Sequence, residues 1–226
     1  RYYSMCASIE RIMEFDNIYE KEVCTKTTNV NKNMVCTEIE INSITFSYPS
    51  RINEDDIVNK NITNEYVLKN ASLIIHSGDC IAITGHSGIG KSTLLKLLLS
   101  IYKPNSGNIM VKLKSEEEDF SLALDKNLRK IFSYVPQGNA LLSGTIYEAV
   151  AFLQTNNSGF SELEKSKIKY ACKVACADTF IEELENGYDT VIGERGAGLS
   201  EGQIQRLSIA RAVYYNAQIL LLDEAT

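Results

Sequence analysis

The sequence predicts an α/β fold, because short apolar strands and helical patterns alternate along much of the chain. Residues 79–84 have the pattern of a buried strand, and residues 94–102 form an apolar helical run just beyond a glycine-rich turn. Later in the chain, a helical pattern at 203–214 precedes the wholly apolar strand 219–222. With 226 residues, of which 44% are hydrophobic and 23% charged, the chain is long enough for one large core.

The glycine-rich turn fits the phosphate-binding template G-x-x-x-x-G-K-[ST] and lies where that template requires, between a strand and a helix. Its residues are Gly85, His86, Ser87, Gly88, Ile89, Gly90, Lys91, Ser92 and Thr93. The glycines let the backbone curl so that its N–H groups face one anion, and the helix N-terminus adds its dipole. Lys91 would carry positive charge to the outer phosphates, and Ser92 would ligate Mg²⁺. The competing interpretation is an ordinary turn that opens a helix.

Two acidic residues, Asp223 and Glu224, follow the apolar strand 219–222. Parallel α/β sheets bind ligands at the carboxyl ends of their strands, so Asp223 is the candidate Mg²⁺ carboxylate. Glu224 is the candidate base that polarises the water attacking the γ-phosphate. The alternative is that both acids cap the next turn.

Composition excludes several functional classes. The net charge of -6 argues against nucleic-acid binding, which needs a basic face. The six cysteines contain no C-x-x-C pair and the only histidines are His76 and His86, which argues against a zinc site. Cys172 and Cys176 lie one helical turn apart, and we interpret them as small apolar residues in preference to a redox pair. The sequence contains no apolar run near the ~18 residues of a membrane span and no signal-peptide pattern.

The N-terminal part differs in pattern from the rest. Residues 1–20 are predicted to form an amphipathic helix that needs a partner surface, and residues 21–37 are polar enough for a linker. The domain proper is then 38–226. It opens on a strand at 38–48 whose alternation breaks near residues 42 and 43.

A family resemblance rests on four motifs in a fixed order. Leu199-Ser200-Glu201-Gly202-Gln203, which opens a helix, resembles the signature of ATP-binding cassette (ABC) proteins, whose commoner form has Gly in place of Glu201. The other motifs are the phosphate loop, Gln137 in Val-Pro-Gln, and the ending Leu-Leu-Leu-Asp-Glu-Ala-Thr. The resemblance implies a P-loop NTPase core with a mixed sheet, a small antiparallel β subdomain and an inserted α-helical subdomain at about 138–202.

Further matches resemble the exporter branch of that family. Phe46-Ser47-Tyr48-Pro49-Ser50-Arg51 looks like the adenine-stacking segment, so Tyr48 would lie against the base; otherwise it is a strand-end aromatic residue. Residues 194–196 resemble the loop that touches the membrane domain, and residues 7–12 the tail after its last membrane helix. The resemblance implies ATP-powered export, with a transmembrane domain on the same polypeptide, at the cytoplasmic face of the plasma membrane.

The resemblance also implies a composite ATP site between two domains, in a homodimer or a heterodimer. ATP would be held by the phosphate loop of one domain and by Ser200, Glu201, Gly202 and Gln203 of the other, with the Glu201 carboxylate turned away from the nucleotide. Lys91 and Mg²⁺ would offset charge, and Glu224 would orient or deprotonate water. Gln137 would sense the metal and relay closure to the membrane part.

The sequence departs from the family pattern at its end, because the family's switch histidine lies downstream of the acidic strand. We therefore expect this chain alone to hydrolyse ATP weakly or not at all, and its sheet to expose apolar surface. A soluble, non-transport ABC ATPase is the main alternative. A small-molecule kinase would not need residues 199–203, and a degenerate half of a heterodimer disagrees with the intact Lys91, Gln137 and Glu224. The transported substrate is not indicated.

Overall fold

The structure, a computed structural model, describes residues 34–48, 66–115, 118–138, 141–153, 159–193 and 198–223. The chain divides into two compact units, Arg1–Lys32 and Asn33–Thr226. All described residues belong to the second unit, so the predicted N-terminal amphipathic helix lies outside them. Of the predicted linker only the last residues are described, and they already belong to the first strand.

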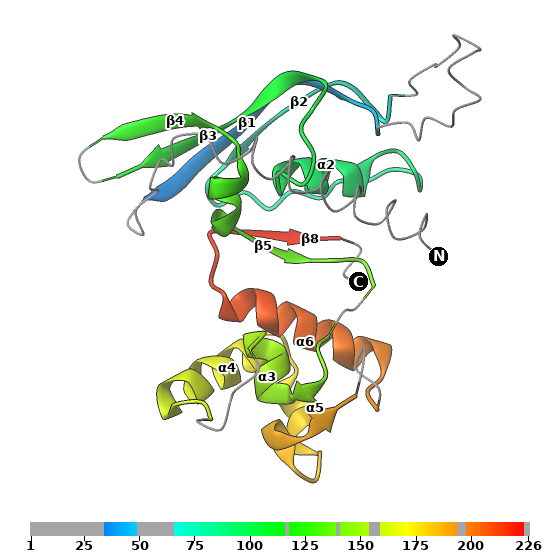
Figure 1. Ribbon diagram of the computed structural model, residues 1–226, viewed down its shortest axis with the longest axis vertical. Coiled ribbons are helices and arrows are strands. Elements are labelled where there is room, and N and C mark those ends of the chain that lie inside the picture. The colour runs from blue at the N-terminus through cyan, green and yellow to red at the C-terminus, as the bar shows by residue number, and fades with distance from the viewer. Residues whose placement is uncertain are drawn as a thin grey trace, which may run out of the picture. The chain divides into compact units, whose positions relative to one another are not determined.

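An antiparallel sheet forms the first part of the second unit (Figure 1). Its strands are β1 (Val35–Phe46), β2 (Leu68–His76), β3 (Ser106–Lys114) and β4 (Asp119–Ala123), in the order β2-β1-β3-β4. β1 begins three residues before the predicted strand. β4 was not predicted, because its first residue belongs to an acidic run that has the composition of a loop.

The break predicted in β1 is confirmed. The pairing of β1 with β2 shifts register between Ile41 and Ile44, and Ser43 there has a φ of 47°. This irregularity lets Ile39, Ile41 and Ile44 all be buried although they do not share one alternation phase. Gly107 on β3 accommodates the bulge, since a Cβ at that position would collide with the backbone carbonyl of Asn42.

A parallel pair of strands and one helix make the second layer. β5 (Phe132–Val135) follows the 3-10 helix η2 (Lys126–Ile131) and pairs in parallel with β8 (Ile219–Leu222). Helix α2 (Lys91–Leu98) follows the glycine-rich turn and buries Thr93, Leu95, Leu97 and Leu98. The parallel pair and the antiparallel sheet are separate sheets in the described part of the chain.

The predicted strand at 79–84 is wrong for this structure. These residues have no regular secondary structure, and Ile81 and Ile83 are 44% and 41% exposed. A strand needs a neighbour for its backbone groups, and no described strand pairs with this segment. On β8, Leu220 and Leu222 are each 46% exposed. Apolar surface is therefore exposed here, as the sequence led us to expect.

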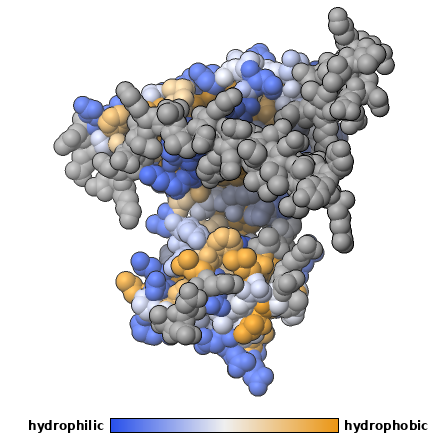
Figure 2. Space-filling view, in the orientation of Figure 1, coloured by the Kyte–Doolittle hydropathy of each residue, from blue (hydrophilic) through white to orange (hydrophobic). Residues whose placement is uncertain are grey.

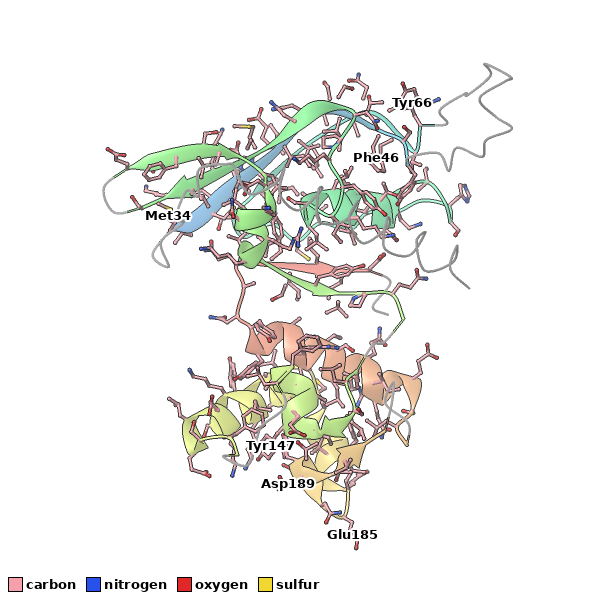
Figure 3. The ribbon with its side chains drawn as sticks, in the orientation of Figure 1. Met34, Phe46, Tyr66, Tyr147, Glu185 and Asp189 are labelled. Atoms are coloured by element: carbon pink, nitrogen blue, oxygen red, sulfur yellow. The ribbon has the colours of Figure 1, made fainter. Side chains whose placement is uncertain are left out.

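A helical part lies between β5 and β8 in the sequence. It contains β6 (Gly144–Thr145), α3 (Ile146–Ala151), α4 (Glu162–Val174), α5 (Asp178–Glu182), the 3-10 helix η3 (Gly187–Asp189), β7 (Val191–Ile192) and α6 (Glu201–Tyr214). β6 pairs with β7, and one buried cluster of Ile, Val, Ala, Cys and aromatic side chains joins the helices. Figure 3 labels Tyr147 in this part, where its ring stacks on that of Tyr188.

Three helices of this part begin with the same device. Thr145, Ser161 and Ser200 are N-caps of α3, α4 and α6, and each forms a capping box with the residue three positions later. In such a box two N–H groups that the helix leaves unpaired are satisfied reciprocally. The box explains why α6 begins at Glu201, two residues before the predicted start.

The strand part and the helical part lie on opposite sides of the parallel pair. Figure 1 shows α2 and the antiparallel sheet on one side of β5 and β8, and α3 to α6 on the other. Figure 2 shows hydrophobic and hydrophilic residues mixed over the visible face of the helical part. In the described ranges, no helix is long and apolar enough to cross a membrane.

Candidate functional site

The phosphate loop has the backbone geometry that its glycines predict. Gly85, Gly88 and Gly90 have φ values of 147°, 84° and 105°, which side chains with a Cβ rarely adopt. Gly90 is also crowded, because an added Cβ would lie 2.9 Å from the Leu68 Cδ2 atom. Glycine is therefore required at position 90 both by conformation and by the close approach of β2.

The N-terminus of α2 differs from the other helix starts. Its N-cap is Gly90 in the left-handed region, which supplies no side-chain acceptor, whereas α3, α4 and α6 are capped by hydroxyl groups. The first N–H groups of a helix need acceptors, and the helix dipole favours an anion there. The loop and α2 together therefore form a phosphate-binding geometry.

Lys91 spans the loop. Its Nζ donates to the carbonyl oxygens of Gly85 and His86, at 2.9 and 3.0 Å. The ammonium therefore lies directly beside the turn whose backbone would surround a phosphate. Two neutral carbonyl partners can be exchanged for an anionic phosphate, which makes a stronger, charge-assisted bond.

Two residues that the sequence assigned to the metal lie in contact. The Ser92 hydroxyl donates to the Asp223 Oδ1 atom at 2.9 Å, across 131 positions of sequence. Asp223 is only 6% exposed, and its backbone N–H donates to the Val135 carbonyl, so it continues the parallel ladder. A hydroxyl beside a carboxylate is a donor set that suits Mg²⁺, which prefers oxygen ligands.

Tyr134 belongs to the same cluster, although the sequence did not single it out. Its hydroxyl donates to the Asp223 Oδ2 atom at 3.1 Å. Burial, together with the nearby Asp223 carboxylate, raises the pKa of Tyr134 to about 12. The tyrosine therefore stays protonated and remains a donor near neutral pH. Only the pairing of β5 with β8 makes it a neighbour of Asp223, and that pairing is not visible in the sequence.

The predicted adenine-stacking residue is tied to the phosphate loop. The Tyr48 hydroxyl lies 2.9 Å from the Thr93 hydroxyl, and the Tyr48 ring packs edge-on against Phe46 and Tyr102. The centroid distances to these two rings are 5.1 and 5.3 Å. Tyr48 is 38% exposed, so part of its surface is open to solvent. Its stacking on adenine stays a prediction.

The signature residues lie on a different element. Ser200 accepts from the Gln203 N–H and Gln203 accepts from the Ser200 N–H, at 3.3 and 2.8 Å, while Glu201 and Gly202 are exposed in the first turn of α6. The box uses Ser200 as an acceptor and leaves its hydroxyl proton for another partner. α6 and α2 lie on opposite sides of β5 and β8 (Figure 1).

The remaining predicted site residues are placed only in part. Gln137 lies two positions beyond β5 and is exposed. Glu224 lies outside the described residues, and so do the resemblances at 7–12, 49–51 and 194–196. The roles assigned to all of these stay predictions.

Comparison with known proteins identifies the family. The family model described as "ABC transporter" matches residues 68–226, which is more than half of the chain. The chain belongs to the ABC transporter family. The fold class predicted from the sequence is thereby confirmed, as is the resemblance on which it rested.

Relatives of this ABC domain include exporters. It is 36% identical over 219 residues to ABC transporter B family member 29, chloroplastic, of Arabidopsis thaliana, covering 97% of this chain and 31% of the relative. It is 40% identical over 196 residues to the leukotoxin translocation ATP-binding protein LktB of Mannheimia glucosida, covering 82% of this chain and 26% of the relative.

A solved structure has the same fold. The structure of a bacterial Atm1-family ABC exporter with ATP bound aligns with all of this chain and 36% of its own, at 29% identity and a TM-score of 0.70. This ABC domain thus spans about a quarter to a third of the length of the relatives it matches.

Proposed function

We propose that this chain is the ATP-binding and ATP-hydrolysing domain of an ABC exporter. The observation that carries the proposal is the contact between Ser92, at the start of α2, and Asp223, at the end of β8. It places a candidate metal site beside a phosphate-binding loop. Exporters and a toxin translocator among the relatives favour transport over a soluble ABC ATPase.

Each group in the site would have one role. Lys91 and the N-terminus of α2 would hold the phosphates, and Ser92, Asp223 and Gln137 would hold Mg²⁺. The ion would neutralise charge on the phosphates during transfer. Glu224 would orient or deprotonate the attacking water, and Tyr48 would lie against the adenine.

The complete site would need a second ABC domain, identical or not. Because α6 lies across the parallel pair from α2, Ser200, Gly202 and the N-terminus of α6 would act on nucleotide held by the partner. Closure of the two domains would then drive a transmembrane domain of the same polypeptide. Residues 1–20 would lead from that domain, and residues 138–202 would form the helical subdomain. We propose the cytoplasmic face of the plasma membrane as the location.

The test is transport by the natural full-length protein reconstituted in lipid vesicles. Replacing Glu224→Gln should preserve ATP binding and reduce hydrolysis at least a hundredfold, since the water would lose its base. Replacing Lys91→Ala should weaken binding itself. Hydrolysis at the normal rate by the Glu224→Gln protein would refute the assignment of Glu224. ATP-independent transport by the wild-type protein would refute the proposed function.

A further inference from the structure

The Asp223 carboxylate is held from two sides by hydroxyl groups on separate elements. Ser92 at the start of α2 donates to Oδ1, and Tyr134 on β5 donates to Oδ2. A carboxylate offers acceptor positions on both oxygens, so the two bonds do not compete with each other. With the side chain almost fully buried, these donors decide which way the two oxygens face.

β5 fixes both the backbone and the side chain of Asp223. Tyr134 pairs in register with Leu221 of β8, two positions before Asp223. The Asp223 N–H then bonds the carbonyl of Val135, the next residue of β5, at 3.0 Å. The main-chain bond leaves the carboxylate free to turn about its side-chain torsions. The Tyr134 hydroxyl restrains that rotation.

The two hydroxyl bonds differ in what a metal ion would do to them. An ion held by Ser92 and Asp223 would need the Ser92 oxygen and a carboxylate oxygen that this hydroxyl now occupies. The Tyr134 bond uses the other carboxylate oxygen. It can therefore persist while the Ser92 bond is exchanged for a metal ligand.

We infer that Tyr134 is a positioning residue, which holds Asp223 with Oδ1 toward Ser92 and so increases the affinity of the site for Mg²⁺ with ATP. The inference rests on the proposed function, because it assigns a role within that ATP site. It adds a residue that belongs to none of the sequence motifs quoted above. Orientation of a metal ligand by an outer hydrogen bond is a general way to tune such sites.

The variant Tyr134→Phe tests the inference, since it removes one hydroxyl and keeps the ring. ATP affinity should be measured for the natural full-length protein in excess Mg²⁺ and again in a chelator. We expect roughly tenfold weaker binding with Mg²⁺, the loss typical of a bond to a charged group, and unchanged binding without it. A merely structural hydroxyl would change both affinities alike or neither.

Tyr215→Phe is the matched control. It also removes one tyrosine hydroxyl bond, which runs to the Ala151 carbonyl at 3.2 Å within the helical part. Its ATP affinity should stay the same in both conditions, while its thermal unfolding reports the cost of losing such a bond. If Tyr134→Phe changes ATP affinity with Mg²⁺ no more than Tyr215→Phe does, the inference is overturned.

The outcome also separates this inference from the proposed function. If the wild-type protein binds ATP no more tightly in Mg²⁺ than in chelator, or does not bind it at all, the metal site itself is refuted. If the wild-type protein shows the Mg²⁺ effect and Tyr134→Phe keeps it in full, only the role of Tyr134 fails. Asp223→Asn should abolish the Mg²⁺ effect and serves as the reference for a complete loss.

Discussion

Cys172 and Cys176 are one helical turn apart and have opposite environments. Cys172 is fully buried, and burial raises its pKa to about 12, whereas Cys176 is exposed just after α4 ends. The thiolate is the reactive form, and a pKa near 12 leaves on the order of 10⁻⁵ of the thiol ionised at pH 7. This supports the packing interpretation of Cys172.

We predict that iodoacetamide labels Cys176 readily at pH 7 while Cys172 stays unlabelled. Peptide mass spectrometry of the native chain measures both sites in one sample. In denaturant the two should react at similar rates, since the burial is lost. Equal labelling of the two cysteines in the native chain would contradict the buried position of Cys172.

Two glycines of the phosphate loop provide a second comparison at the scale of one residue. Gly88 and Gly90 both have positive φ, but a Cβ meets nothing within 4 Å at Gly88 and lies 2.9 Å from Leu68 at Gly90. We expect Gly88→Ala to lower the free energy of unfolding by about 1 kcal/mol, from backbone strain alone. Gly90→Ala should cost roughly twice as much. Urea unfolding measures both, and an equal cost would show that β2 can move away.

At the scale of elements, Arg129 on η2 binds the end of α2. Its Nε donates to the Leu99 carbonyl at 2.7 Å and its Nη2 to the Ser100 carbonyl at 3.0 Å. The last carbonyls of a helix lack intrahelical donors and attract cations. This fork therefore attaches the helix of the phosphate loop to the segment that leads into β5.

Replacing Arg129→Ala should reduce the free energy of unfolding by about 1 kcal/mol, because two carbonyls lose a charged donor at a partly exposed site. Arg129→Lys should recover part of that loss, since it restores the charge and not the fork. Thermal unfolding of the two variants and the wild type gives the comparison. If the alanine variant unfolds like the wild type, the fork contributes nothing measurable.

At the scale of the whole molecule, the sequence predicted what local patterns determine. The phosphate loop, the apolar strand before Asp223 and the helices of the helical part follow from glycine positions and from the spacing of apolar residues. The strand at 79–84 failed because a strand also requires a neighbour, which no local pattern supplies. Tyr134 was missed for a related reason: its closeness to Asp223 depends on the register of two strands far apart in sequence.

The unpaired strand edge has a consequence for the chain in solution. β8 pairs with β5 on one edge only, and Leu220 and Leu222 stay 46% exposed. An open edge with apolar side chains is a template for association with another chain. The exposed Leu163 and Val174 of α4 lack this property, because the backbone groups of a helix are already paired.

We predict that the purified chain of 226 residues self-associates and binds a hydrophobic dye. Replacing Leu220→Thr and Leu222→Thr together should weaken self-association on the order of tenfold, by removing apolar area from the edge while keeping strand propensity. The same change at Leu163 and Val174 should have a much smaller effect. Sedimentation velocity over a range of concentrations measures the association. A wild-type chain that stays monomeric throughout, or a larger effect from the α4 pair, would show that the edge of β8 is not where the chains meet.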